Sequence, residues 1–348
     1  MSRRPLLADD ARITLAHGGG GQAMRRLIEE IFLPAFDNPL LAELEDQALI
    51  DLAPITAAGD RLAFTTDSYV VDPLFFRGGD IGTLAVAGTV NDLAMAGARP
   101  LVLSCGMVIE EGLDIGTLRR VVASMSRVAG EAGVRVVTGD TKVVERGAAD
   151  KLFINTSGIG VVARGVRLSA RQARPGDAVI VNGFLGDHGI AILMARGQLA
   201  LEGDISSDCQ PLANLVATML DCCPRIHCLR DATRGGLASV LNEFARASGV
   251  SITIDEDALP LRLEVKGACE ILGLDPLYLA NEGKLVAIVP AGDAAMLLEA
   301  MHAHPAGRHS AIVGEVRDDP LTTVVLRTTF GGKRIVDMLV GEQLPRIC

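Results

Sequence analysis

The sequence contains no tryptophan, and aromatic residues make up only 3% of its 348 residues. Its 33 lysines and arginines are outnumbered by 43 aspartates and glutamates, so the formal net charge is −10. Nucleic-acid-binding proteins need a basic surface for the phosphates, and those that bind single strands also stack bases on aromatic rings. The composition therefore argues against nucleic acid as a partner.

Long apolar runs are also missing. No stretch approaches the roughly 18 apolar residues of a membrane span, and the N-terminal "MSRRPLLADDARITLAH" lacks the apolar region of a signal peptide. The seven cysteines are an odd number without disulfide-framework spacing. Residues 222–228, "CCPRIHC", match no zinc pattern, and we interpret them as structural. These features predict a cytoplasmic protein with no membrane association.

The chain is long enough for two folded domains, with 49% apolar and 22% charged residues. Short β-branched runs alternate with helical patterns, which predicts an α/β (α+β) fold. We place domain boundaries to give residues 1–168, 169–338 and a terminal tail, 339–348. Strands are expected at 61–66, 101–108, 134–138, 152–163, 178–182, 251–254, 284–289, 310–316 and 322–327. Helices are expected near 187–196, 210–220, 234–248 and 293–303.

One further helix is marked by an apolar stripe followed by glycines. Apolar residues spaced three and four apart form one face of a helix. Gly130 and Gly133 then fit its C-terminal stop, because glycine readily adopts the backbone conformation that ends helices. The stripe comprises Leu118, Val121, Val122, Met125 and Val128.

Three aspartates in the first half are candidate metal ligands. Asp67 in "TTDSYVVDP" follows an apolar strand, and Asp92 in "TVNDLAMAG" lies in a helix before a glycine. Asp140 in "VVTGDTKVVERG" follows a strand and a glycine. Mg²⁺ prefers oxygen ligands and leaves room for substrate phosphates. Each aspartate taken alone is equally consistent with a turn residue or a helix cap.

Two acidic residues in the second half extend this set. Asp231 in "LRDATRGGLASVLNEFA" precedes a glycine pair that opens an amphipathic helix, so it is a candidate cap, metal ligand or phosphate-binding residue. Glu282 in "NEGKLVAIVP" lies in a turn just before a strand. An ordinary turn residue is the alternative interpretation of Glu282.

A glycine run near the N-terminus is a candidate phosphate-binding loop. Gly18, Gly19, Gly20 and Gly21 in "HGGGGQAMRRLIEEI" precede a helix with an apolar face. Backbone N–H groups of such a loop can approach a phosphate without interference from a Cβ atom. The pattern is not a P-loop, and its match to a dinucleotide-binding fingerprint is weak. A flexible loop is the alternative.

The C-terminal segment "GEQLPRIC" ends on Cys348, a thiol at the last position of the chain. An unprotected thiolate is a nucleophile that oxidises and cross-links readily, so this residue is either accidental or functional. Gly341 is a flexible joint, and Pro345 restricts the chain just before the thiol. Ten residues can extend about 33 Å, enough to cross a domain-sized groove.

Several long segments resemble one family. They are "TDSYVVDPLFFRGGDIGTLAVAGTVNDLAMAGARP", "GDTKVVERGAADKLFINTSGIG", "GDHG", "RDATRGGLA", "NEGK" and the terminal "PRIC". Together they are similar to the HypE family of hydrogenase maturation factors from about residue 14 to residue 348. This family lies in a superfamily with aminoimidazole ribonucleotide synthetase, thiamine-monophosphate kinase and selenophosphate synthetase.

The resemblance implies a two-domain aminoimidazole ribonucleotide synthetase-like fold. It also implies a homodimer in which the first domains pair into a β-barrel, with ATP and Mg²⁺ held in the groove between domains. The acidic metal positions of the family fall on Asp67, Asp92, Asp140 and Asp231. The implied partners are the carbamoyltransferase maturation factor HypF and the iron-carrying HypC–HypD complex.

The activity implied by the resemblance uses the terminal thiol as a carrier. HypF places a carbamoyl group on Cys348, and ATP-dependent dehydration then gives a thiocyanate that supplies the cyanide ligand of [NiFe]-hydrogenase iron. Lys142 is our candidate for the cation that neutralises developing charge, and Glu282 for the base or amide-orienting group. A surface salt bridge is the alternative for Lys142.

Other functions remain open from the sequence. A selenophosphate synthetase would carry a reactive residue near its N-terminus, whereas Cys105 is the first cysteine here. Aminoimidazole ribonucleotide synthetase and thiamine-monophosphate kinase have no use for a terminal thiol. A non-catalytic, nucleotide-gated carrier of metal or persulfide would use one, and ATP hydrolysis dependent on carbamoylated Cys348 distinguishes it from an enzyme.

Overall fold

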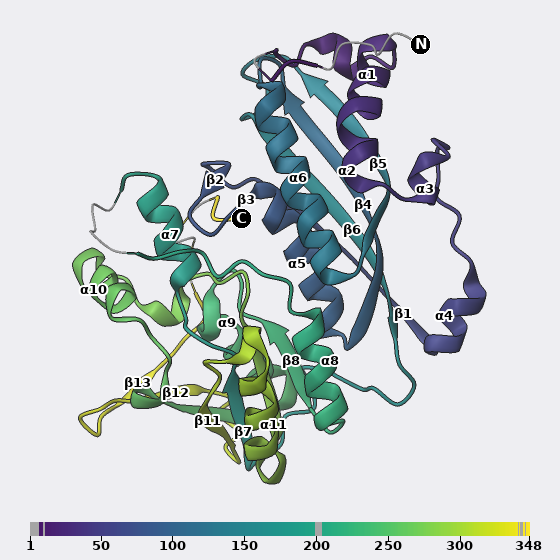
Figure 1. The fold of residues 1–348 in the computed structure, drawn as a ribbon. Helices are drawn as coiled ribbons and strands as arrows, with labels where there is room; N and C mark the ends of the chain where they lie inside the picture. Colours follow the sequence, from purple (N-terminus) through teal and green to yellow (C-terminus); the bar gives the residue numbers. More distant parts are fainter. Residues whose placement is uncertain (1–6, 10, 199–203, 340, 342–343, 345) are drawn as a thin grey trace.

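The fold comprises two large β-sheets with their covering helices, and a small two-stranded sheet (Figure 1), described in a computed structural model for residues 7–9, 11–198, 204–339, 341, 344 and 346–348. The first sheet has four strands in the order β1-β6-β4-β5. Their bounds are Arg61–Tyr69 for β1, Ala98–Glu110 for β4, Arg135–Val144 for β5 and Leu152–Val162 for β6. Only β4 and β5 are parallel, and helix α6 (Ile115–Ala132) connects them, as a parallel pair requires a crossover.

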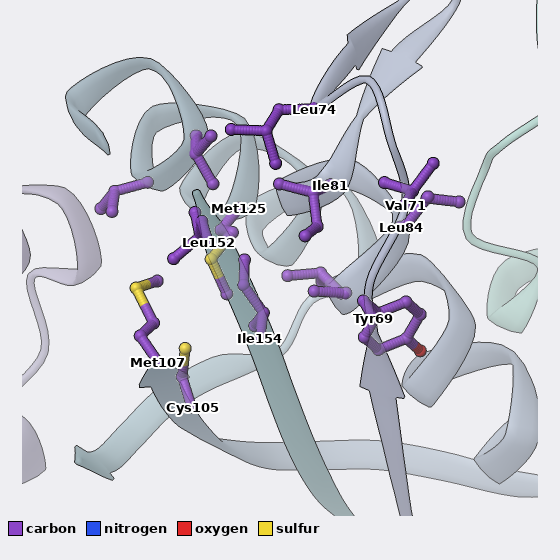
Figure 2. Close-up of a cluster of buried hydrophobic side chains, with 14 of the residues drawn as sticks. Tyr69, Val71, Leu74, Ile81, Leu84, Cys105, Met107, Met125, Leu152 and Ile154 are labelled. Atoms are coloured by element: carbon purple, nitrogen blue, oxygen red, sulfur yellow. The ribbon is translucent and has the colours of Figure 1, made fainter. Parts of the chain in front are cut away.

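Helices α5 (Ile81–Met95) and α6 cover one face of this sheet. The predicted apolar stripe of α6 is buried, and Gly133 ends the helix with φ +68°. Gly130 lies inside the helix, so only the second glycine acts as the predicted stop. Figure 2 shows the core that results, in which Met125 and Leu84 of the helices face Cys105 and Ile154 of the strands.

The N-terminal segment runs along α6 and the β5 edge (Figure 1). It begins with a 3₁₀ turn at Leu15–Gly18, followed by the short α1 (Gln22–Leu27). A π-helical turn at Ile28–Phe32 continues α1 into α2. The remaining short elements are α2 (Leu33–Phe36), α3 (Pro39–Ala42), α4 (Leu52–Ala58), β2 (Phe75–Phe76) and β3 (Gly79–Asp80).

The second sheet has seven strands in the order β13-β12-β9-β11-β7-β10-β8. Its strands are β7 (Asp177–Val181), β8 (Cys228–Asp231), β9 (Ser251–Asp255), β10 (Leu285–Pro290), β11 (Ala311–Arg317), β12 (Val324–Arg327) and β13 (Lys333–Ile335). Its helices are α7 (Asp187–Ala195), α8 (Ala213–Cys222), α9 (Gly236–Ser248), α10 (Leu263–Leu272) and α11 (Ala291–Ala303). Single 3₁₀ turns lie at Glu256–Ala258, Pro276–Tyr278 and Pro305–Gly307.

Both faces of the seven-stranded sheet are covered by helices. Along β7, Val179 packs with the apolar side of α9, whereas Ile180 packs with α8 and α11. Because successive side chains of a strand point to opposite faces, a strand buried on both sides is apolar at every position. This explains the uninterrupted apolar runs of β7 and β10, which the sequence analysis located correctly.

Helix α5 links the two sheets. It is buried almost throughout, and its last turn, at Ala94 and Met95, packs with the core formed by α8 and α11. Small residues at Gly82 and Gly88 allow this helix to approach its neighbours, since a Cβ at Gly88 would lie 2.3 Å from the Tyr69 hydroxyl. Within the described part of the chain, no helix is long and apolar enough to cross a membrane.

Candidate active site

Four acidic residues from both parts of the fold interact electrostatically with one another. Asp67 comes from β1, Asp92 from α5, Asp231 from the end of β8 and Glu282 from the turn before β10. We call these four residues the acidic cluster. Thr65 donates a hydrogen bond to Asp92 at 2.8 Å, and Arg234 forms an ion pair with Asp67 at 3.8 Å.

Burial and the charges of neighbouring carboxylates disfavour the charged forms of Asp92, Asp231 and Glu282. Burial raises the pKa of Asp231 to about 7, and the nearby charges of Asp92 and Asp67 add to the effect. The pKa of Asp92 is raised for the same reasons, despite the hydrogen bond from Thr65. Burial raises the pKa of Glu282 well above its usual value, and Asp208, Asp231 and Asp67 contribute. Perturbed carboxylates that converge from different elements are typical of active sites.

The backbone of Glu282 is fixed from two sides. Its N–H donates to Asp208 at 3.0 Å, and its carbonyl accepts from the Asn91 amide at 3.3 Å. Asn91 directly precedes Asp92 on α5, so the same helix turn positions the Asp92 side chain and the Glu282 backbone. The side-chain atom Oε1 of Glu282 is buried and has no hydrogen-bond partner among the described residues.

A buried ion pair supports this turn. Lys284 Nζ lies 2.9 Å from Asp208 Oδ2, with side chains only 7% and 3% exposed. Burial alone would raise the pKa of Asp208, but the charge of Lys284 and the hydrogen bond from the Glu282 N–H outweigh it, so the pKa is lowered and the carboxyl stays ionised. The sequence analysis missed this pair, although Lys284 lies in the "NEGK" segment.

The raised pKa of Glu282 predicts a pH-dependent stability in metal-free protein. Between its ordinary pKa of 4.5 and its higher folded value, Glu282 holds a proton that the unfolded chain releases. Stability must therefore fall as pH rises through this window, by at most about 1.4 kcal/mol per pH unit. Glu282→Gln removes this contribution. The thermal midpoint of the variant, relative to that of wild type, should therefore be higher at pH 8 than at pH 5.

The control for this prediction is Glu299→Gln, which changes an exposed glutamate on α11. Its midpoint should stay at a constant offset from wild type at both pH values. Thermal unfolding is followed by circular dichroism in the presence of a chelator. A constant offset for Glu282→Gln as well would show that Glu282 titrates normally in the folded protein.

The acidic cluster fits Mg²⁺ in its chemistry. All of its donors are carboxylate oxygens, which Mg²⁺ prefers, and a bound cation would relieve the repulsion among them. The unpartnered Oε1 of Glu282 is a further oxygen that needs a partner. In the described part of the chain, no three His, Cys, Asp or Glu side chains are already close enough to hold a metal. Water and nucleotide phosphates would have to complete such a site.

The structure places Asp140 and Lys142 away from the acidic cluster of the same chain. Both lie within β5, at the opposite edge of the sheet from the β1 strand of Asp67. In the strand register, Asp140 lies opposite Gly106, and Gly106 lies opposite Asn155. Asp67 lies opposite Thr156, the next residue of the same strand. Because successive residues of a strand point to opposite faces, the two aspartates do so as well. Three strand spacings, about 14 Å, separate the two edges. Lys142 Nζ lies 3.2 Å from Asp140 Oδ2 on the exposed face.

These positions correct two details of the sequence analysis. Asp67 and Asp140 were expected after strands, but both lie inside them. Strands β1 and β5 continue past their apolar residues because their backbone hydrogen bonds to neighbouring strands continue there. Asp231 does not cap α9, whose N-cap is Gly235.

The glycine run lies beside the same β5 strand. A Cβ at Gly18 would lie 2.7 Å from the backbone nitrogen of Val143, so only glycine permits this approach. Gly20 has φ +74°, in the left-handed region that favours glycine, and Gly21 precedes α1. The structure thus brings Gly18 against the strand that carries Asp140 and Lys142, and Gly19 to Gly21 follow it in the chain. We call Gly18 to Gly21, Asp140 and Lys142 the β5 group.

Cys348 is buried at 8% exposure, and its carboxylate accepts a hydrogen bond from Val70 N–H at 3.0 Å. The sequence analysis expected an exposed thiol, but the terminal residues have specific partners that hold them in the protein. Gly341 has φ +83°, as a flexible joint permits, whereas Pro345 lies outside the described residues. Ile347 and Ala280 line one pocket with Arg234, so the tail ends beside the segments that carry Asp67 and Glu282.

The cysteines of residues 222–228 have structural contacts, as predicted. Cys223 Sγ lies 3.6 Å from Asp293, and His227 Nδ1 lies 2.7 Å from Asp177. All seven cysteines of the chain are free of disulfides.

Comparisons with known proteins identify the family of this chain. Two family models match, namely the N-terminal domain of AIR synthase related proteins at residues 44–162 and the C-terminal domain of the same proteins at residues 174–327. Carbamoyl dehydratase HypE of Rhodobacter capsulatus is 59% identical over 339 residues, which is 97% of this chain and 99% of the relative. The chain belongs to the HypE family.

Solved structures of the HypE family have the same fold. The chain superposes with a TM-score of 0.91 on hydrogenase maturation protein HypE in complex with ATP, which is 51% identical, covering 96% of this chain and 99% of that one. It also superposes with a TM-score of 0.78 on the HypE chain of a HypE–HypF complex, at 48% identity, covering 90% of this chain and 99% of that one. The predicted two-part synthetase-like fold is therefore confirmed.

Proposed function

We propose that this chain is an ATP-dependent carbamoyl dehydratase that acts on its own C-terminal cysteine. The reaction converts Cys348–S–C(=O)–NH₂ and ATP into Cys348–S–C≡N, ADP and phosphate. The thiocyanate would supply the cyanide ligand of [NiFe]-hydrogenase iron. The observation that carries the proposal is the docked C-terminus, which brings Cys348 to the turn of Glu282 and the end of β1.

ATP is required because an amide oxygen leaves poorly as hydroxide. Transfer of the γ-phosphate to that oxygen turns it into phosphate, and removal of two protons from nitrogen then gives the nitrile. Mg²⁺ would supply charge neutralisation on the ATP phosphates. Glu282 is the proposed base or amide-orienting group, and its unpartnered Oε1 is available to a carbamoyl N–H. Lys142 is the proposed cation for the transferred phosphoryl group.

A homodimer would unite the two groups that lie apart in one chain. The face of the four-stranded sheet opposite α5 and α6 exposes Leu62 and Phe64, at 55% and 71%. Asp140 and Lys142 lie on that face. Pairing of this face with a second copy would bury the apolar side chains and bring the β5 group of one chain toward a partner chain. The first-domain dimer predicted by the resemblance therefore remains our proposal.

The dimer proposal predicts the effect of a charge on this face. Phe64→Glu should yield a monomer, because a buried carboxylate without a partner is costly in an apolar interface. Light scattering measures the change, and ATP affinity should fall with it. Leu263→Glu on α10, where the side chain is 83% exposed, is the matched control and should leave both unchanged. If Phe64→Glu protein remained a dimer with normal ATP affinity, the interface would lie elsewhere.

The metal and nucleotide assignments predict the effect of neutralising single aspartates. Asp92→Asn, Asp231→Asn and Asp140→Asn each keep the side-chain shape but remove a negative charge. Each should weaken Mg²⁺–ATP binding by roughly tenfold or more, because fewer charged oxygens remain for the cation. Calorimetric titration measures the affinity, with exposed Asp257→Asn as control. If Asp140→Asn alone kept full affinity, the β5 group would not be part of the nucleotide site.

The proposed partners follow from the carrier role. HypF would carbamoylate Cys348, which requires the buried tail to leave its pocket, and HypC–HypD would receive the cyanide. The complex of a HypE relative with HypF supports the first partner. We retain the division after residue 168 as a proposal, since the two family models flank it. The seven free cysteines support the proposed cytoplasmic location, where thiols stay reduced.

A further inference from the structure

The last three residues of the chain are held by their backbone oxygens. Arg196 donates from Nη2 to the Arg346 carbonyl at 2.7 Å, and His188 Nε2 lies 2.9 Å from the Ile347 carbonyl. Val70 N–H donates to the Cys348 carboxylate at 3.0 Å. Backbone contacts at three consecutive residues fix the register of a segment, since a shift by one residue breaks all of them.

The side chain of Arg346 adds a second constraint on register. Its Nε donates to the Val70 carbonyl at 3.0 Å, and its Nη1 donates to Asp150. Val70 thus contacts the tail through both its N–H and its C=O. Arg346 itself has φ +53°, an uncommon conformation for a residue with a side chain, which persists only where its surroundings enforce it.

The hydrogen-bond partners of His188 determine which ring nitrogen carries the proton. A carbonyl can only accept, so Nε2 carries a hydrogen and donates it to Ile347. Nδ1 lies 2.8 Å from Ser207 Oγ, which itself accepts from Cys209 N–H at 3.1 Å. Burial lowers the pKa of His188, so the ring is neutral and Nδ1 accepts from the Ser207 hydroxyl. Each hydrogen bond in this series then has a defined donor and a defined acceptor.

Packing holds the His188 ring in that orientation. The residue is fully buried in the first turn of α7. The ring of Phe76 meets it edge-on, with centroids 5.6 Å apart and planes at 83°. A ring confined on all sides, with both nitrogens bonded, presents its Nε2–H at a fixed point.

We propose that His188 is a positioning residue for the terminal tail: its Nε2–H holds the Ile347 carbonyl and so sets how far the Cys348 thiol enters the site. This inference rests on the proposed function, in which Cys348 carries the carbamoyl group. His188 does not touch the reacting atoms. It acts through the backbone, and Ser207 acts through it by selecting the tautomer.

Two substitutions of equal polarity separate the role of each nitrogen. His188→Gln places an amide N–H near the Nε2 position, whereas His188→Asn reaches only the Nδ1 position and cannot bond Ile347. The first readout is the rate at which a carboxypeptidase removes Cys348 from the unmodified full-length protein. His188→Asn should accelerate release roughly tenfold or more, as expected when a buried hydrogen bond is lost, while His188→Gln stays within about threefold of wild type.

The second readout is the single-turnover loss of water from the carbamoylated protein at saturating ATP. His188→Asn should slow this step while ATP affinity is unchanged, and His188→Gln should restore most of the rate. A glycine inserted between Ile347 and Cys348 should keep all contacts of Arg346 and Ile347 yet slow dehydration, because the thiol is displaced.

The outcomes distinguish the two proposals. Equal release rates for His188→Asn, His188→Gln and wild type would overturn the positioning role of His188. If release follows the expected order but wild-type carbamoylated protein never loses water with ATP, the proposed function fails and the positioning of the tail stands.

Discussion

Cys348→Ser is expected to abolish formation of the dehydrated product while ATP affinity stays within about twofold of wild type. A serine hydroxyl is far less acidic than a thiol, so it is a poor nucleophile for accepting a carbamoyl group at neutral pH. The substitution exchanges one small side chain for another at the margin of the core, so the fold should persist. Intact mass after incubation with HypF, carbamoyl phosphate and ATP measures the product.

The control for this experiment is Cys222→Ser, which changes a partly exposed cysteine on α8. It should accumulate the dehydrated form as wild type does, since its sulfur donates to the Met296 carbonyl at 3.8 Å, within the second domain and away from the tail. A dehydrated product on Cys348→Ser protein would show that another residue carries the carbamoyl group.

Glu282→Gln and Lys142→Ala are each expected to slow dehydration of carbamoylated protein by about 10²–10⁴-fold, the range typical of general acid–base and electrostatic catalysis. A carboxyl whose pKa is raised takes up a proton readily, which is the property that a base for the carbamoyl nitrogen needs. Lys142 pairs with Asp140 on the exposed face of the sheet, so its charge remains accessible to a phosphoryl group.

Binding and chemistry are separated by measuring ATP affinity and the single-turnover rate on the same variants. Interactions that form mainly in the transition state lower the rate more than the affinity. Glu299→Gln and Lys266→Ala change exposed residues of the same types, on α11 and α10, and should leave both quantities unchanged. Losses of equal size in rate and affinity would make Glu282 and Lys142 binding residues.

The elements that the sequence located are those in which burial imposes a pattern. The stripe of α6 and the apolar runs of β7 and β10 each face a core. The spacing of their apolar residues therefore indicates which of their faces are buried. Helix α10 was missed because Leu263 and Ile271 are exposed on it, which blurs its amphipathic pattern. Strand β13 was missed because all three of its residues are exposed.

The site was only partly accessible to sequence reasoning. Segments around Asp92, Asp231 and Glu282 carry recognisable motifs, and the fold brings these residues together. That Asp140 points away from Asp67 depends on strand register across four strands, which no local pattern encodes. The contact of His188 with Ile347 joins residues 159 positions apart, and a lone buried histidine carries no sequence signal for such a partner.

The central claim is that the carbamoylated terminal thiol loses water at the expense of ATP. The most direct test is the intact mass of purified protein that HypF has carbamoylated, measured before and after ATP and Mg²⁺ are added without HypF. We expect the carbamoylated species to lose one water, with the change located on Cys348 by fragmentation and one ADP released for each dehydrated chain. A mass that stays constant while ATP is bound or hydrolysed would contradict the proposed function.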